Sequence, residues 1–295
     1  FNVLLNINYF PAKETIYGAD FSFDPSEKIV LNLKLANYQR DEDKNTPAIA
    51  PADPGDPFTG IPAATSSIDF ERKSALVSAL FRLPLNTDIT VGYEHLREVG
   101  ENRGTLDFFG PQPRDFNLTR TTKSPFAEAK IKPLEPLIIH LGVRRDSISD
   151  QQNETRPSAG VRFTFPDTKT TLKAHYAEGF KPPSFFALGD PISGNPNLLS
   201  ETSKSAEIGF EQGFWADRAS FSAALFKTKY KNLIDFDFAT FRLVNRNRVN
   251  ADGAELELKV RPLEKLSIAL NYTFVDLEIE DSDINLRNRP KHRAG

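Results

Sequence analysis

The sequence predicts an all-β fold, a transmembrane antiparallel up-and-down β-barrel. Three observations predict it: long segments in which apolar and polar side chains alternate, short turns that alternate with long loops, and one hairpin sequence that nearly repeats. Membrane-crossing strands alternate lipid-facing apolar with interior polar side chains, so their mean hydropathy can resemble that of a soluble protein. The mean hydropathy here is −0.42. No apolar run reaches the roughly 18 residues that a membrane-spanning helix requires.

The alternation has the period of two that defines a β-strand. Leu256 and Leu258 alternate with Glu255 and Glu257, and full charges on the second face fit a water-filled interior better than a protein core. Many of the expected strands exceed the globular norm of about 5–6 residues, and a tilted strand crosses a bilayer with about 9–11. The expected spans are approximately 14–24, 28–40, 69–83, 87–99, 117–131, 137–149, 156–165, 169–180, 202–213, 217–234, 241–261 and 265–281.

Two segments depart from strict alternation. In 69–83 both faces mix apolar and polar residues, and in 274–279 the apolar positions change from even to odd at Val275. A β-bulge would produce such a change, and so would the edge of the membrane. The sequence does not distinguish these two explanations.

Short and long connections alternate along the chain, apart from one short link at 10–14. Proline, which presets φ and donates no ladder hydrogen bond, occurs in most of the short ones. An up-and-down barrel has this asymmetry when one rim carries turns and the other carries loops. The expected tight turns are 23–28, 83–88, 132–136, 165–169, 213–218 and 261–265, and the expected long loops are 41–68, 99–117, 149–156, 181–201, 234–241 and 281–289.

One hairpin type recurs. Residues 130–141 read KIKPLEPLIIHL, and residues 259–270 read KVRPLEKLSIAL. An internal repeat of this kind indicates a meander built from similar units.

Composition excludes several classes of function. There is no cysteine, hence no disulfide framework and no thiolate metal site. The net charge is −3, from 37 basic and 40 acidic residues, and nothing suggests nucleic-acid binding. There is no methionine, even at position 1, and Phe1 to Phe10 has no signal-peptide features. We therefore expect a processed N-terminus or a segment of a longer protein.

No residues predict catalysis. The four histidines, His95, His140, His175 and His292, lack metal-ligand spacing. By parity, His140 and His175 belong to the polar face and His95 to the apolar one. No nucleophile elbow, phosphate-binding loop or paired carboxylates occur in a fitting context. We expect neither an enzyme nor a metal site nor a cofactor.

A specific resemblance lies in residues 174–212, AHYAEGFKPPSFFALGDPISGNPNLLSETSKSAEIGFEQ. This segment resembles the barrel of TonB-dependent outer-membrane receptors, and within that family it is most similar to siderophore and cobalamin receptors. The resemblance continues in LVNRNRVNADGAELEL (243–258), in NYTFVDLEIED and in an Arg-Pro-x-His segment that ends at His292. The matching residues in 174–212 are Tyr176, Glu178, Gly179, Phe180, Lys181, Pro183, Gly194, Asn195, Pro196, Leu198, Glu201, Thr202, Glu207, Gly209 and Glu211.

The resemblance implies a bacterial outer-membrane receptor with a barrel of about 22 strands around a plug domain. Such receptors import a ferric siderophore, haem or cobalamin, and the TonB–ExbB–ExbD complex drives import through a TonB box ahead of the plug. We find about thirteen strands and the beginning of another, with neither plug nor TonB box. Residues 1–295 are therefore expected to be an incomplete barrel without its plug domain and closing strands.

The resemblance also implies that ligand meets the extracellular loops and the plug. Aromatic and basic side chains there suit siderophores, which present flat rings or negative charge. Pro182 and Pro183 are expected to stiffen a strand exit, and Arg162 and Glu178 to line the lumen. The ligand-binding candidates are Phe108, Phe109, Arg114, Phe180, Lys181, Phe185 and Phe186.

Two other hypotheses remain open at this point. A passive outer-membrane porin would share the barrel pattern but would have no plug or TonB box. A soluble all-β binding domain, a sandwich or propeller, would share the alternation but not the strand length or the loop asymmetry. Outer-membrane lipid is the expected surrounding for both barrel hypotheses.

Overall fold

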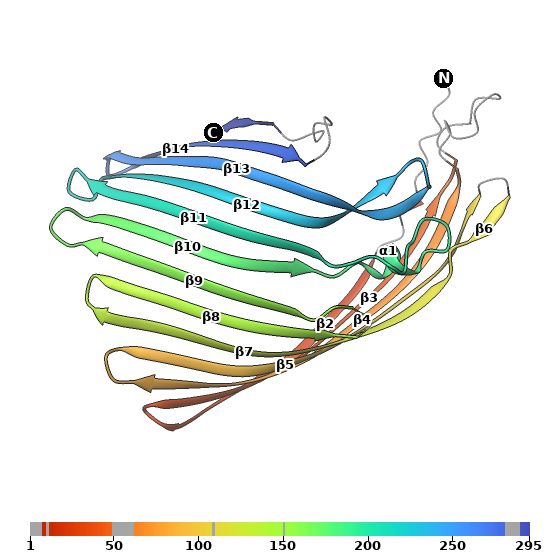
Figure 1. The fold of residues 1–295 in the computed structure, drawn as a ribbon, viewed down its shortest axis with the longest axis horizontal. Helices are drawn as coiled ribbons and strands as arrows, with labels where there is room; N and C mark the ends of the chain where they lie inside the picture. The colour runs from red at the N-terminus through yellow and green to blue at the C-terminus, as the bar shows by residue number, and fades with distance from the viewer. Residues whose placement is uncertain (1–7, 10–11, 49–61, 108–109, 150, 281–289) are drawn as a thin grey trace.

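A computed structural model describes residues 8–9, 12–48, 62–107, 110–149, 151–280 and 290–295, which form one curved, open antiparallel sheet of 15 strands (Figure 1). Nearly every long strand pairs with the next one along the chain, as in an up-and-down meander. At one edge, β1 and β2 both pair with β3. In the described residues no pairing joins the two edges of the sheet, as expected for part of a barrel.

The structure has one helix and fifteen strands within the described residues. No helix in this part of the chain is long and apolar enough to cross a membrane. The elements are β1 (Asn8–Tyr9), β2 (Lys13–Ser26), β3 (Ile29–Thr46), β4 (Ala64–Leu83), β5 (Thr87–Asp107), β6 (Pro111–Pro113), β7 (Phe116–Leu134), β8 (Leu137–Ile148), β9 (Glu154–Phe165), β10 (Thr170–Lys181), α1 (Phe185–Gly189), β11 (Glu201–Phe214), β12 (Ala219–Asp237), β13 (Arg242–Leu263), β14 (Leu266–Ile279) and β15 (His292–Ala294).

All twelve predicted strands are present, but several extend into segments predicted to be loops. β3 continues to Thr46, β4 begins at Ala64 and β5 continues to Asp107, so parts of the predicted loops 41–68 and 99–117 are wrong. Their polar residues pair with neighbouring strands, for example Ser67 with Asp43 and Arg103. At the loop end of these strands, polar residues show where the strand leaves the lipid, not where the strand ends.

The near-repeat is one structural unit used twice. In the first copy, the ladder passes from Ile131 opposite Ile139 to Leu134 opposite Leu137, with a register shift around Pro133. In the second copy it passes from Val260 opposite Ile268 to Leu263 opposite Leu266. A proline lacks the N–H that a regular ladder needs, so a β-bulge accommodates it.

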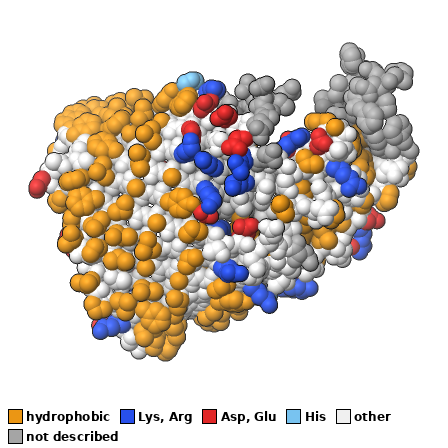
Figure 2. All heavy atoms as spheres, viewed as in Figure 1, with side chains coloured by type: hydrophobic (Ala, Val, Ile, Leu, Met, Phe, Trp, Pro, Cys, Tyr) orange, Lys and Arg blue, Asp and Glu red, His pale blue; other side chains and the backbone are white. Residues whose placement is uncertain are grey.

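The two faces of the sheet differ in chemistry. One face carries a band of exposed apolar side chains near the tight turns, among them Ile208 and Leu225, which are 60% and 58% exposed. Figure 2 shows hydrophobic side chains over this part of the molecule and charged side chains beyond it. Water would disfavour so large an apolar surface, whereas lipid favours it. Tyrosines stand on the same face where the band gives way to charges: Tyr17, Tyr93, Tyr176 and Tyr272.

The other face is the lumenal face. The register of the strands shows which of the residues predicted to be lumenal lie on it. His140 and His175 lie on it, as does Arg162, beside acidic and basic neighbours in one concavity. The prediction for Glu178 is wrong. Its position has the parity of Leu172 and Tyr176, so its side chain lies on the outer face and accepts a hydrogen bond from the Tyr176 hydroxyl at 2.5 Å.

The change of apolar phase at Val275 comes from the membrane boundary. The ladder between β13 and β14 is continuous from Val249–Ile279 to Val260–Ile268, so no bulge occurs there. On the outer face the apolar positions end at Phe274, and Asp276 follows.

A soluble sandwich is excluded by the single layer of sheet. Sandwiches bury a core between two packed sheets, whereas the few buried apolar residues in the described part of this chain lie mostly near the loop end: Ile148, Ala187, Leu198, Ala219, Val249 and Ala251.

Candidate ligand-binding pocket

The connection between β10 and β11, residues 182–200, folds into an ordered segment that contains α1. Two prolines fix extended backbone ahead of the helix. Ser184 is the N-cap, and its hydroxyl accepts a hydrogen bond from the Ala187 N–H at 3.1 Å. Such a cap satisfies one of the free N–H groups of the first turn. Figure 1 shows α1 at the end of the molecule away from the tight turns.

Two arginines fasten α1 to the lumenal side of the sheet. Arg114 lies just before β7, and Arg120 lies within it. Arg114 donates two hydrogen bonds to the carboxylate of Asp190, at 2.9 and 3.0 Å. Arg120 donates to the Pro183 carbonyl oxygen at 2.5 Å and lies 3.8 Å from Glu98. Paired N–H donors of this kind hold a carboxylate in one orientation, so the helix has a defined position.

Asp190 is the centre of this attachment. Asp190 is only 2% exposed. Its carboxylate also accepts hydrogen bonds from the Ser193 hydroxyl at 2.5 Å and from the Ser193 N–H at 3.0 Å. Burial raises the pKa of Asp190, but the hydrogen bonds from Arg114 and Ser193 outweigh burial and hold its pKa below the usual value. Asp190 is therefore ionised at neutral pH.

Aromatic packing completes the attachment. The Phe185 ring packs over Gly100 of β5, where a Cβ atom would lie 2.3 Å from the ring. The guanidinium of Arg120 lies 4.8 Å from the centroid of the same ring, and that of Arg114 lies 5.0 Å from the Phe186 ring. These are favourable cation–π distances. Only glycine at position 100 leaves room for Phe185.

The second half of the segment is fastened to β13. The Asn195 side chain donates to the Leu243 carbonyl at 3.1 Å. Asn245 accepts from the Leu199 N–H at 2.8 Å and donates to the Leu199 carbonyl at 3.0 Å. Leu198 is 1% exposed. The Gly-Asn-Pro-x-Leu motif and the asparagine-rich strand thus bind one another.

A pocket of about 720 Å³ opens between α1 and the lumenal face of β3 to β7. Its wall combines cations, aromatic rings and carboxylates. Arg40 is half-exposed and donates to Glu42 at 2.7 Å. The lining residues that bear rings or charge are Tyr38, Arg40, Glu42, Lys44, Phe70, Glu98, Glu101, Arg114, Phe116, Arg120, Phe185 and Phe186.

Three of the seven predicted ligand-binding residues, Arg114, Phe185 and Phe186, line this pocket. Phe180 lies at the end of β10, where the Arg156 guanidinium covers its ring at 4.5 Å. The Lys181 side chain is 76% exposed and pairs with Glu201 at 3.1 Å. Phe108 and Phe109 lie outside the described residues.

Sequence reasoning missed the part of the pocket that comes from β3. Tyr38, Arg40 and Glu42 alternate on the lumenal face, and the strand prediction stopped at residue 40. The signal was present: the period of two continues through 38, 40, 42 and 44 with ring or charge at each position. The arrangement can bind a charged, ring-containing ligand. No group of three or more metal-ligating side chains occurs among the described residues.

A family model described as "TonB dependent receptor-like, beta-barrel" matches residues 2–295. The chain therefore belongs to the TonB-dependent receptors, as residues 174–212 predicted, and its location is the bacterial outer membrane. The family is one of receptors rather than enzymes.

A probable TonB-dependent siderophore receptor, PiuA, from Acinetobacter baumannii is 23% identical over 196 residues, which is 59% of this chain and 26% of that protein. The siderophore receptor PirA from Pseudomonas aeruginosa is similar in structure, with a TM-score of 0.62 and 19% identity over 91% of this chain and 57% of that one. The copper transporter OprC has a TM-score of 0.75 and 15% identity over 98% of this chain and 49% of that one. The chain spans about a quarter to just over half of the length of these relatives.

Proposed function

We propose that this chain forms part of the barrel wall of a receptor that imports a ferric siderophore or a similar scarce nutrient, such as haem or cobalamin. The pocket beside α1 carries the proposal. It places guanidinium groups and aromatic rings together on the lumenal face, at the loop end of the barrel. Ferric siderophores present negative charge and flat rings, which these groups bind favourably.

The residues of the pocket have two different roles, support of α1 and contact with ligand. Arg114 and Arg120 hold α1 through hydrogen bonds to the Asp190 carboxylate and to the Pro183 carbonyl. Arg40 and Phe186 are more exposed and line the same pocket. We assign ligand contact to Arg40 and Phe186, and assign support of the pocket to Arg114 and Arg120.

Transport requires more of the protein than this wall. In the proposed mechanism a plug domain closes the lumen, and the TonB–ExbB–ExbD complex displaces it through a TonB box. The lumenal charges, including Arg162 and Lys173, then face the plug across water. The remaining strands of a barrel of about 22 close the sheet.

The test uses the complete receptor encoded by the gene, purified in detergent and also expressed in cells. Binding is measured for ferric catecholate, ferric hydroxamate, haem, cobalamin and Cu²⁺. We expect one of these to bind, and Arg40→Gln to weaken its binding about tenfold or more, since a hydrogen bond to a charged group contributes about 1.5–3 kcal/mol. Phe186→Ala should weaken the same binding about two- to tenfold, since a contact between aromatic rings contributes about 0.5–1.5 kcal/mol. The control is Lys181→Gln, because Lys181 carries charge near the loops but does not line the pocket.

Uptake separates the receptor from the passive channel. A receptor loses uptake when TonB is deleted, whereas a porin keeps it. TonB-independent uptake at the wild-type rate would overturn the proposal. So would Arg40→Gln and Phe186→Ala variants that bind every tested ligand as tightly as the wild type does.

A further inference from the structure

The outer face carries an apolar groove that the receptor function does not use. Its volume is about 650 Å³. Ala159, Ala174 and Ala206 form its floor because their side chains end at Cβ. Larger side chains from β8 to β12 form its walls: Ile139, Leu141, Val161, Tyr176, Ile208 and Leu225. We call this the outer groove.

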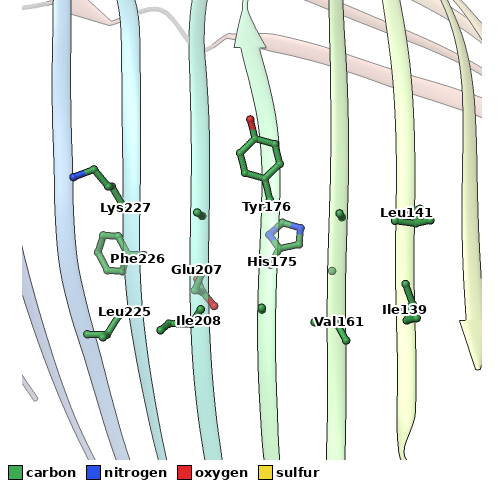
Figure 3. A pocket seen from close by; sticks show the side chains of 14 residues that line it. Ile139, Leu141, Val161, His175, Tyr176, Glu207, Ile208, Leu225, Phe226 and Lys227 are labelled. Atoms are coloured by element: carbon green, nitrogen blue, oxygen red, sulfur yellow. The ribbon is translucent and has the colours of Figure 1, made fainter. Parts of the chain in front are cut away.

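Figure 3 shows how the groove is oriented. Lys227 and Tyr176 lie nearer the loop end of the strands, and Leu225, Ile208 and Ile139 lie nearer the tight turns. Tyrosines at this level mark the boundary between hydrocarbon and headgroups in membrane barrels. The groove therefore runs from hydrocarbon depth up to the headgroup region.

A cluster of cations begins where the groove ends. Lys204 stands directly opposite Lys229, and Lys231 stands directly opposite Arg248. Like charges in directly opposed positions destabilise a sheet unless anions neutralise them. With Lys227, which lines the groove, these five residues form what we call the basic rim.

Carboxylates neutralise only part of the basic rim. Glu178 pairs with Lys204 and Asp252 pairs with Lys227, both at 2.8 Å. Glu280 pairs with Arg248 at 3.3 Å. Among the described residues, no carboxylate lies within 4 Å of the amino groups of Lys229 and Lys231. The rim thus has two cations in excess, at the depth where lipid phosphates lie.

We infer that the outer groove and the basic rim together hold one outer-leaflet lipid whose headgroup carries phosphate. An acyl chain lies in the groove, and the phosphate binds Lys229 and Lys231. The apolar outer groove matches the acyl chain of such a lipid, and the uncompensated positive charge of the basic rim matches its phosphate. The inference rests on the outer-membrane location and does not depend on which nutrient is imported.

The experiment measures lipid binding to the complete receptor in detergent micelles, by native mass spectrometry. The probes are bisphosphorylated lipid A and its dephosphorylated form. We expect the wild-type receptor to bind the phosphorylated form at least tenfold more tightly. The Lys229→Gln/Lys231→Gln double variant should lose this preference, and Ile208→Trp, which fills the groove, should weaken binding of both forms.

The matched control is Lys173→Gln/Lys259→Gln, which removes the same charge from the lumenal face and should keep the wild-type preference. Heat-modifiable gel migration identifies any variant that fails to fold. Wild-type preference in the Lys229→Gln/Lys231→Gln variant would overturn the inference. Complete competition by millimolar inorganic phosphate would identify a free-anion site instead, and loss of self-association in that variant would identify a contact between receptor copies. Either result would also overturn it.

Discussion

Arg114 and Asp190 are the residues on which the candidate pocket depends most. They join segments 76 residues apart in the sequence through two parallel hydrogen bonds. Removing one partner from a buried ion pair leaves the other charged and unpaired, which costs about 3–5 kcal/mol. Because the pair fastens only one segment, we expect this loss of free energy to appear as local opening of α1 rather than as unfolding of the sheet.

Asp190→Asn should therefore release α1. We expect amide hydrogen exchange in residues 185–195 to accelerate about a hundredfold, since about 3 kcal/mol of local stability is lost. Exchange in β8 and β9 should not change. The control is Lys169→Gln, which breaks an exposed pair with Asp217 worth at most about 1 kcal/mol. Unchanged exchange in 185–195 of the Asp190→Asn variant would contradict this account.

The same carboxylate predicts a dependence on pH. The pKa of Asp190 is lowered in the folded state from an ordinary value of 3.8, so its contribution to stability is complete above that value. It decreases as the pH falls through the folded-state pKa. Hydrogen exchange in 185–195, corrected for intrinsic rates, should therefore show full protection at pH 5 to 7 and lose it only in strong acid. Loss of protection between pH 5 and 7 would show that another group controls α1.

At the scale of elements, α1 and the bulged hairpins each depend on one small structural requirement. The hairpins require a register shift at Pro133 and at Pro262. The helix requires a position without a side chain on β5, which Gly100 supplies. In each case one residue decides how two elements meet.

Gly100→Val should displace α1 without disturbing the sheet. Its Cβ would lie 2.3 Å from the Phe185 ring, and overpacking of this kind costs about 1–3 kcal/mol. Ligand affinity and protection of 185–195 should both fall. Gly209→Ala is the control, because its Cβ would meet Lys173 at an ordinary 3.7 Å. Equal behaviour of the two variants would argue against the proposed packing.

Strands were more predictable than connections. Alternation in segments such as 254–260 located most of the long strands, because the two faces of a membrane-crossing strand meet different solvents. The strand in 69–83 was predicted although its two faces mix apolar and polar residues. The same rule placed 41–46 and 99–107 in loops, since both faces become polar beyond the membrane while the ladder continues. α1 was missed because a five-residue helix has too few residues for a helical period. Its only local signal was the capping residue Ser184.

At the scale of the whole molecule, the described part of the sheet has no packed apolar core on either face. The outer face is apolar at Val77, Val91 and Leu141, which remain exposed. The lumenal face carries charge at positions such as Asp88 and Glu128. Such a sheet is stable where lipid covers one face and water or a plug meets the other.

A charge should be tolerated on one face only. Val91→Arg places a charge in the lipid band and should cost about 2–4 kcal/mol near the bilayer midplane. Thr90→Arg, one residue away, faces the lumenal concavity beside Asp88 and Glu128 and should be nearly neutral. Assembly into outer membranes, measured by heat-modifiable gel migration, should fall for Val91→Arg alone. Equal assembly of both variants would contradict the assignment of faces.

The candidate site was predictable only in part. Arg114, Phe185 and Phe186 follow from their residue types and their place in loops, and the structure brings them into one pocket. Tyr38, Arg40 and Arg120 could not be joined to them from sequence. They come from strands, and only the register of β3 to β7 places them beside α1.

The sequence by itself determined the strand pattern, the two unlike faces and the family, because alternation and the 174–212 motif are local properties of the chain. The tertiary structure alone decided which residues form the pocket and that Glu178 faces outward. It also showed that Lys229 and Lys231 have no anionic partner among the described residues. These facts depend on cross-strand register, which pairs residues tens of positions apart, and a one-residue shift would turn every side chain to the other face.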